Sequence, residues 1–270
     1  MEDHDKGLVF DLERMATPRR REVLGWLGVA ACLPLIGCGD DEKAGESAET
    51  GGAGGDSGWN SDSCAVIPEE TEGPYPGDGT NGPDALALDD IVRSDIRSSI
   101  GDLSGTAAGV PLTIRLRVVD VNNGCAPLAG YAIYLWHCDR DGNYSLYSIT
   151  DQNYLRGVQV TDDDGVLSFT SIFPGCYSGR WPHIHFEVFS SLAEASNGRN
   201  NVKTSQIALP EDACEAVYAT SGYEDSVRNL QQITLDSDNV FSDGVEDQMP
   251  TISGSASEGY TIRLTVGIEA

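Results

Sequence analysis

The feature that most constrains the fold is a series of apolar segments that alternate like β-strands. In residues 111–121 every second position is apolar, at Leu112, Ile114, Leu116 and Val118. This period of two is typical of a strand with one buried face. Four further segments follow the same logic: 130–138, 165–172, 181–190 and 260–268. The sequence therefore predicts a protein built mainly of strands.

Turn and helix signals complete this prediction. Asn122-Asn123-Gly124 has turn composition, and 162–165 is expected to form a hairpin turn. Short helices are predicted from Glu211 to about Ala219 and over 223–230. We therefore expect an all-β fold: a β-sandwich core with long loops and one or two short helices.

The N-terminal residues have the pattern of an export signal. Three arginines, Arg19 to Arg21, precede an apolar run over 23–36 that is short for a membrane span but has the length of a signal-peptide core. Arg20-Arg21 resembles a twin-arginine motif, and 35–38 resembles a lipobox in which Cys38 is lipidated. The alternative is an apolar membrane anchor with a basic flank. We expect a leader over 1–37 and a lipid anchor at Cys38.

The next segment and the overall charge bear on location and partners. Residues 38–63 are acidic and rich in Gly and Ser, which predicts a flexible tether ahead of a single domain over 64–270. The net charge of −26 excludes nucleic acid as a partner, because phosphates would be repelled. We expect an exported protein, lipid-anchored to the cell envelope on its periplasmic or outer-surface face.

Five cysteines fall within 64–270: Cys64, Cys125, Cys138, Cys176 and Cys214. Export to an oxidising compartment favours disulfides, and the odd number predicts two bridges and one free thiol. The pairing stays open. A cysteine-based metal site is disfavoured because the sequence contains no CxxC spacing.

The most informative chemistry lies in 175–188. On a strand, His183 and His185 project from the same face, while Ile184, Phe186 and Val188 face the core. Two adjacent imidazoles form a metal half-site, and two of the three histidines after residue 37 stand here. The alternative is a pair of exposed or hydrogen-bonded strand histidines. A nearby tyrosine could add a hard anionic oxygen that suits a ferric ion.

Several segments, in their order and spacing, resemble the intradiol ring-cleavage dioxygenases, particularly their exported branch. These segments are 71–75, 135–139, 142–144, 155–159, 161–162, 172–175, Tyr177 and 180–185. The resemblance implies a non-haem Fe(III) cofactor in a β-sandwich. Its ligands here would be Tyr144, Tyr177, His183 and His185, with Tyr147 as the second choice for the first position.

The resemblance also implies roles near the metal. Tyr177 would leave the iron when substrate binds and take up a substrate proton, and Arg180 would stabilise developing negative charge. Gln206 resembles a supporting glutamine through a looser match. Tyr75 would line the substrate entrance, with simple packing as the alternative. The partners would be a small aromatic diol, a catechol or hydroxyquinol, and O₂, giving a cis,cis-muconate-type diacid.

Departures from the better-known cytosolic enzymes bear on the substrate. His137-Cys138-Asp139 replaces a small apolar stretch, and the 177–183 segment is compressed, so the substrate stays open. A disulfide between Cys138 and Cys176 is one hypothesis for tying the ligand loops together. Two other functions also stay open: a non-catalytic β-sandwich surface-binding lipoprotein module, and a Zn or Cu site without tyrosinate. Whether the chain forms a homodimer is open too.

Overall fold

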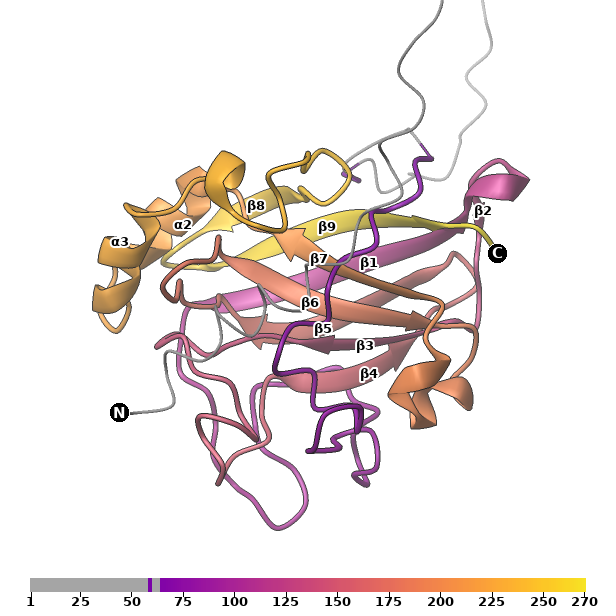
Figure 1. Cartoon of the computed structure of the whole chain (residues 1–270), viewed down its shortest axis with the longest axis horizontal. Helices are drawn as coiled ribbons and strands as arrows, with labels where there is room; N and C mark the ends of the chain where they lie inside the picture. The colour runs from indigo at the N-terminus through magenta and orange to yellow at the C-terminus, as the bar shows by residue number, and fades with distance from the viewer. Residues whose placement is uncertain (1–57, 60–63) are drawn as a thin grey trace, which may run out of the picture.

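Two β-sheets form the framework of the protein (Figure 1). The computed structural model describes residues 58–59 and 64–270. The predicted leader and Cys38 lie outside these described residues, and so does the predicted tether except for Gly58 and Trp59. The first sheet contains β1 (Pro111–Asp120), β2 (Ala126–Pro127), β5 (Val166–Ile172), β8 (Thr251–Ser255) and β9 (Gly259–Ile268). The second contains β3 (Ala132–Trp136), β4 (Arg156–Val160), β6 (His183–Phe189) and β7 (Lys203–Ala208).

The sheets differ in their pairing. In the first sheet β1 pairs in parallel with β9 and antiparallel with β5 and β2, and β8 is antiparallel to β9. The second sheet has the order β4-β3-β6-β7 and is antiparallel throughout. The expected β-sandwich is confirmed, since the two sheets pack face to face through apolar side chains.

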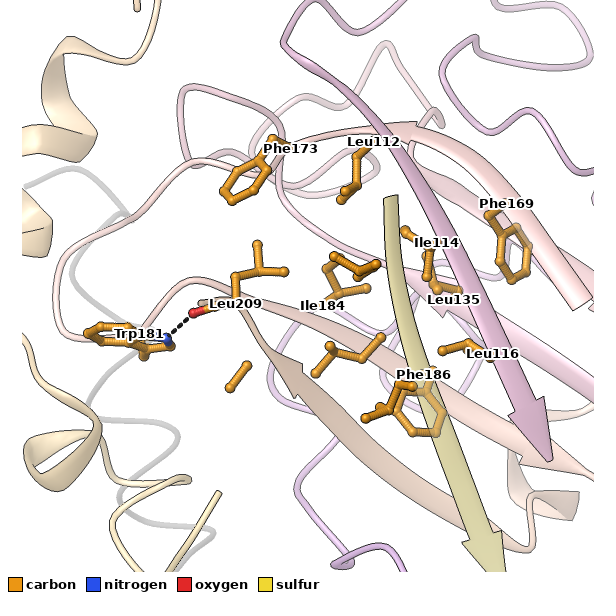
Figure 2. Packing of buried hydrophobic residues seen from close by; sticks show 14 of the residues in the cluster. Leu112, Ile114, Leu116, Leu135, Phe169, Phe173, Trp181, Ile184, Phe186 and Leu209 are labelled. Atoms are coloured by element: carbon orange, nitrogen blue, oxygen red, sulfur yellow. Dashed lines mark hydrogen bonds between the residues drawn. The ribbon is translucent and has the colours of Figure 1, made fainter. Parts of the chain in front are cut away.

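The core lies between the sheets and follows the alternation of the sequence. Leu112, Ile114 and Leu116 of β1 meet Ile184 and Phe186 of β6 there (Figure 2). All five of these side chains are buried. Because the even-numbered residues of β6 face this core, its odd-numbered residues project from the opposite face of the second sheet.

Both predicted helices are present, as α2 (Glu211–Tyr218) and α3 (Glu224–Leu230). Within residues 64–270, four short 3₁₀ segments occur in the connections: Val121–Asn123, Glu194–Ser196, Gly198–Asn200 and Leu235–Ser237. No helix in the described residues is long and apolar enough to cross a membrane.

The predicted hairpin at 162–165 is wrong in one respect. A tight turn does form, with Asp162 Oδ1 accepting hydrogen bonds from the backbone of Asp164 and Val166, and with Gly165 at a φ of 72°. However, the strands that it joins pair with different partners, β4 with β3 and β5 with β1. The turn therefore carries the chain from one sheet to the other.

The outer face of the second sheet is covered by two connections. The segment before β1 crosses β7 and β6, where Glu70 N donates to Thr204 O at 2.9 Å (Figure 1). The long loop between β3 and β4 brings Tyr144 and Leu146 into the same layer as Tyr134 and Trp136. A second hydrophobic cluster thus forms outside the sandwich core, on the face to which the odd-numbered residues of β6 project.

The cysteine prediction requires correction. Cys64 and Cys125 form one disulfide, whereas Cys138, Cys176 and Cys214 are free and buried. The hypothesised Cys138–Cys176 bridge is absent from the described structure. Each of the two thiols instead contacts a backbone carbonyl at 3.5 Å, Cys138 that of Gly175 and Cys176 that of Arg180. The residues 64–270 therefore hold one bridge and three thiols.

Candidate metal centre

The two histidines of β6 lie on the outer face of the second sheet, as the alternation predicts. His185 pairs across the sheet with Trp136 on one side and Gln206 on the other. Its ring stacks on the Trp136 indole at a centroid distance of 5.0 Å and an interplanar angle of 5°. Both histidines are 2% exposed. The sheet register and the stacking partner together fix the orientation of the His185 ring.

Four potential ligand atoms converge at this point. His183 Nε2 lies 3.1 Å from His185 Nε2, 3.2 Å from Tyr177 Oη and 3.5 Å from Tyr144 Oη. The structure thus brings together residues that are up to 41 positions apart in the chain, from Tyr144 to His185. All four residues that the family resemblance singled out as ligands belong to this cluster.

The tautomer of His183 is set by its neighbour. His183 Nδ1 makes a hydrogen bond with the Trp181 carbonyl oxygen, which can only accept, so Nδ1 carries the proton. The Nε2 lone pair then faces the cluster, which is the form that binds a metal. Burial and the nearby Arg180 lower the pKa of His183 well below its usual value, and burial also lowers that of His185. Both rings are therefore neutral.

Tyr144 reaches the cluster from a structured turn. Asp139 Oδ1 accepts hydrogen bonds from the backbone N–H groups of Asp141 and Asn143, each at 2.9 Å. Gly142 adopts a φ of 83°, and a Cβ at this position would lie 3.1 Å from Tyr177 Cβ. Glycine therefore allows the two tyrosine-bearing loops to approach each other closely.

Tyr147, the second choice, points elsewhere. Its hydroxyl donates to Asn81 Oδ1 at 2.7 Å and accepts from Gly77 N at 2.9 Å. These contacts fix it against the N-terminal segment instead of the histidines. The geometry therefore favours Tyr144 over Tyr147 as a ligand.

The remaining histidine of the described chain, His137, has a structural position. Its two ring nitrogens hydrogen-bond Cys138 O and Ser171 Oγ, each at 2.7 Å. Burial lowers its pKa to about 4. With both nitrogens engaged, His137 has no lone pair to offer the cluster.

Arg180 lies in a buried polar network next to the cluster. Its Nε donates to Asp238 Oδ2 at 2.9 Å, and its Nη2 donates to Gln206 Oε1 at 2.7 Å. Gln206 in turn donates to Thr71 O at 2.9 Å. Burial acts to lower the pKa of Arg180, but Tyr177 and Asp238 outweigh it and raise the pKa. Arg180 and Gln206, which the family resemblance singled out separately, are thus in direct contact.

Two residues of this region were not assigned a role from the sequence. Asp238, the partner of Arg180, follows a 3₁₀ segment far along the chain and carries no local signal. Arg156 is fully buried and donates five hydrogen bonds, to Pro76 O, Tyr75 O, Tyr134 Oη, Ser145 O and Ser145 Oγ. Its only sequence signal was its place in the family-like segment 155–159.

Arg156 therefore ties the N-terminal segment to the loop that carries Tyr144. The backbone carbonyl of Tyr75 accepts one of the hydrogen bonds from Arg156, and the Tyr75 ring lies 4.9 Å from the Tyr144 ring. Gly73 adopts a φ of 71°, and a Cβ there would lie 3.2 Å from His185 Cε1. The segment from Gly73 to Tyr75 thus forms one wall of the site.

The donor set fits a metal ion. Neighbouring ligand atoms in a tetrahedral site with bonds of about 2 Å lie roughly 3.3 Å apart, close to the separations found around His183 Nε2. Imidazole nitrogens and phenolic oxygens are ligands for iron, and the oxygens favour the harder ferric state. Burial and Tyr177 raise the pKa of Tyr144 well above its usual value. Metal binding would therefore have to displace phenolic protons.

Comparisons with known proteins find similarity to dioxygenases. A family model described as Dioxygenase matches residues 82–199. An intradiol ring-cleavage dioxygenase from Tetranychus urticae is 27% identical, with a TM-score of 0.58 over 76% of this chain and 95% of that one. A second solved dioxygenase is 26% identical, with a TM-score of 0.59 over the same shares of the two chains.

A shorter match adds a curated relative. A chlorocatechol 1,2-dioxygenase from Rhodococcus opacus is 45% identical over 53 residues, which are 19% of this chain and 21% of that protein. The match thus spans about a fifth of the relative's length. Together, the comparisons show similarity in fold to an intradiol ring-cleavage dioxygenase and a local sequence similarity to dioxygenases.

Proposed function

We propose that this chain, homologous in fold to the intradiol ring-cleavage dioxygenases, is itself a non-haem Fe(III)-dependent enzyme of that kind. It would insert both atoms of O₂ into a catechol-type aromatic and open the ring between the two hydroxylated carbons. The product would be a cis,cis-muconate-type diacid. The observation that carries the proposal is the convergence of Tyr144, Tyr177, His183 and His185 in one buried cluster.

These four residues would hold the ferric ion. When bound, the ion would supply Lewis-acid activation of a coordinated catecholate. The pre-set tautomer of His183, fixed through Trp181 O, keeps its Nε2 available without rearrangement. The stacking of His185 on Trp136 holds the ring plane of the second imidazole.

The two tyrosines differ in their access to solvent. Tyr144 is 2% exposed, whereas Tyr177 is only half-buried. A hydroxyl at the edge of the cluster is better placed to rotate away and to hold a proton taken from an incoming diol. We therefore assign to Tyr177 Oη the role of accepting a substrate proton, and to Tyr144 that of a permanent ligand.

Arg180 would offset negative charge on the bound aromatic. Its guanidinium is always protonated and is held by Asp238 and Gln206, so it acts without moving and without exchanging a proton. Tyr75 and Gly73, which lie against Tyr144 and His185, would border the substrate. A planar aromatic diol suits such a site, since the wall near the tyrosines is itself aromatic.

Iron loading and oxygen consumption together test this function. Purified full-length protein loaded with ferric iron should show the reddish-brown colour of tyrosinate-to-iron charge transfer. It should also consume one O₂ per catechol under air. His183→Ala should lose the iron, whereas Tyr147→Phe is the matched control and should keep both colour and activity. A colourless iron-loaded protein, or one without oxygen uptake on any catechol or hydroxyquinol, would indicate a non-catalytic module instead.

We also propose that the enzyme is exported and anchored through a lipid on Cys38. The disulfide between Cys64 and Cys125 supports an oxidising location, because such bonds do not persist in a reducing cytoplasm. Metabolic labelling with a clickable fatty acid tests the anchor. Wild-type protein should be labelled and found with the membrane fraction, and Cys38→Ala should be unlabelled. Equal labelling of both would contradict the proposal.

A further inference from the structure

Three carboxylates meet on the same outer sheet face, one strand position beyond the candidate iron ligands. Glu187 follows His185 on this face of β6, and Glu72 and Asp78 come from the N-terminal segment that crosses it. One oxygen of each carboxylate lies within 4.8 Å of the others. Glu187 is 0% and Asp78 2% exposed, while Glu72 is half-buried. Acidic side chains are almost never buried to this degree without a compensating partner.

Each of the two buried carboxylates has one oxygen engaged and one without a hydrogen-bond partner. Asp78 Oδ1 accepts from the backbone N and the hydroxyl of Thr80, at 3.1 and 2.6 Å. Glu187 Oε1 accepts from Asn201 Nδ2 at 3.1 Å. In contrast, Asp78 Oδ2 and Glu187 Oε2 have no hydrogen-bond partner anywhere in the described chain. A bound cation would compensate both of these buried oxygens.

The surroundings hold these oxygens in place. Gly198, at the start of a 3₁₀ segment between β6 and β7, packs against Asp78 so closely that an added Cβ would lie 1.9 Å from Oδ2. Asn201 from the same connection fixes Glu187. The carboxylates of Asp78 and Glu187 are therefore enclosed by the N-terminal segment, β6 and the β6–β7 connection, whereas Glu72 stays partly exposed.

The donor chemistry identifies the class of ligand. All three side chains supply hard carboxylate oxygens, and the set contains no nitrogen or sulfur. Ca²⁺ prefers such oxygen ligands, whereas iron and zinc also take nitrogen and sulfur. Ca²⁺ ligands lie at about 2.3–2.6 Å from the ion, so oxygens around one ion can be up to roughly 5 Å apart. Three carboxylates can also provide up to about six oxygens, the lower limit of Ca²⁺ coordination.

We propose that Glu72, Asp78 and Glu187 form a second metal site that binds a hard divalent cation, Ca²⁺ in particular. The site is separate from the Tyr144, Tyr177, His183 and His185 cluster and does not rest on the ring-cleavage proposal. Two ligands come from the N-terminal segment and one from β6, so the cation would fasten this segment to the sheet. Gly73, which contacts His185, directly follows the ligand Glu72. The cation would thus stabilise the wall of the candidate active site.

Calorimetric titration of iron-loaded, calcium-depleted full-length protein with CaCl₂ tests the site directly. We expect one saturable Ca²⁺ per chain and a higher Tm with Ca²⁺ than without. Terbium luminescence provides a second readout, because Tyr134 lies directly opposite Glu187 in the β3–β6 register and can sensitise a bound Tb³⁺. Ca²⁺ should then compete with Tb³⁺ and quench this emission.

Two neutralising variants locate the binding. Asp78→Asn and Glu187→Gln should each weaken Ca²⁺ binding by about tenfold or more. Asp163→Asn, in the exposed turn between β4 and β5, is the charge-matched control and should bind as the wild type does. A circular dichroism spectrum like that of the wild type verifies that a variant is folded, and the half-buried Glu72→Gln replaces any variant that is not. Absence of saturable Ca²⁺ binding to the wild type, or equal affinity in the ligand variants, would overturn the proposal.

Discussion

Asp238 Oδ2 lies 2.9 Å from Arg180 Nε and also accepts the backbone N–H of Trp181 at 2.7 Å. The other oxygen, Oδ1, accepts backbone N–H groups of Val240 and Phe241. The carboxylate therefore has both oxygens occupied and is itself fixed by the chain. Because Arg180 is 3% and Asp238 0% exposed, this ion pair holds a cation rigidly next to the candidate metal ligands.

Asp238→Asn is expected to lower both stability and turnover. It leaves the Arg180 charge buried without its partner, a change that typically costs about 3–5 kcal/mol. In chemical denaturation the free energy of unfolding should fall by that order. In oxygen-uptake assays kcat should fall while the iron colour persists, because Asp238 positions Arg180 and does not bind iron. Asp95→Asn removes an exposed ion pair with Arg97 and should change stability by less than about 1 kcal/mol. Unchanged kcat and stability in Asp238→Asn would contradict this role.

Replacing Tyr144 or Tyr177 should change the visible spectrum of the iron-loaded protein, whereas replacing Tyr147 should not. Tyr144→Phe and Tyr177→Phe each remove one phenolic oxygen near His183, so each should bleach or shift the visible band of the iron-loaded protein. Tyr147→Phe removes a hydroxyl that binds Asn81 and should leave the band unchanged. Absorption spectra of the three variants at equal iron content decide the matter. A band altered by Tyr147→Phe but not by Tyr144→Phe would reverse the ligand assignment.

His137 predicts an acid-side loss of stability. Burial lowers its pKa to about 4 in the folded protein, whereas an unfolded histidine titrates near ~6.5. Its contribution is therefore fully present above pH ~6.5 and is lost as the pH falls towards 4. Between pH 7 and pH 5 this residue should cost about 2 kcal/mol of unfolding free energy. Urea denaturation of His137→Asn should show a pH dependence smaller by that amount; an identical dependence in both proteins would refute the linkage.

The arrangement of thiols is open to chemical mapping. Without reductant, denatured protein should yield a linked Cys64–Cys125 peptide and alkylated Cys138, Cys176 and Cys214. The bridge closes a loop of 61 residues, so the Cys64→Ser, Cys125→Ser double variant should unfold with about 4 kcal/mol less free energy. A second bridge among the three remaining cysteines would contradict the structure.

The strands that the sequence predicted share one property, a long alternating apolar face. β1, β3, β5, β6 and β9 all bury such a face, so local pattern and tertiary packing agree. β2, β4, β7 and β8 were not predicted. In β7 the outward positions Thr204 and Gln206 are polar yet buried, because the N-terminal segment covers them. The apolar-polar contrast that marks a strand is therefore weak in that segment.

Residue spacing alone predicted the two histidines of the candidate site but not the whole ligand set. His183 and His185 are linked by strand periodicity alone, which is a local rule. Tyr144 and Tyr177 come from separate loops. Tyr177 was a candidate because it lies close to the histidines in the sequence, whereas only the family resemblance connected Tyr144 to them. Asp238 is the extreme case, since 58 residues separate it from Arg180 and no local pattern marks a side chain that closes a network from that distance. No local pattern shows that the carboxylates of Glu72, Asp78 and Glu187 lie together either.

Isotope labelling tests the central claim most directly. Iron-loaded protein is incubated with catechol or hydroxyquinol under ¹⁸O₂, and the acyclic product is analysed by mass spectrometry. The account predicts a muconate-type diacid that carries two ¹⁸O atoms, both from one O₂ molecule. A ring-cleaved product that bears an aldehyde, a product without both labels, or unreacted diol from protein that retains its iron would contradict it.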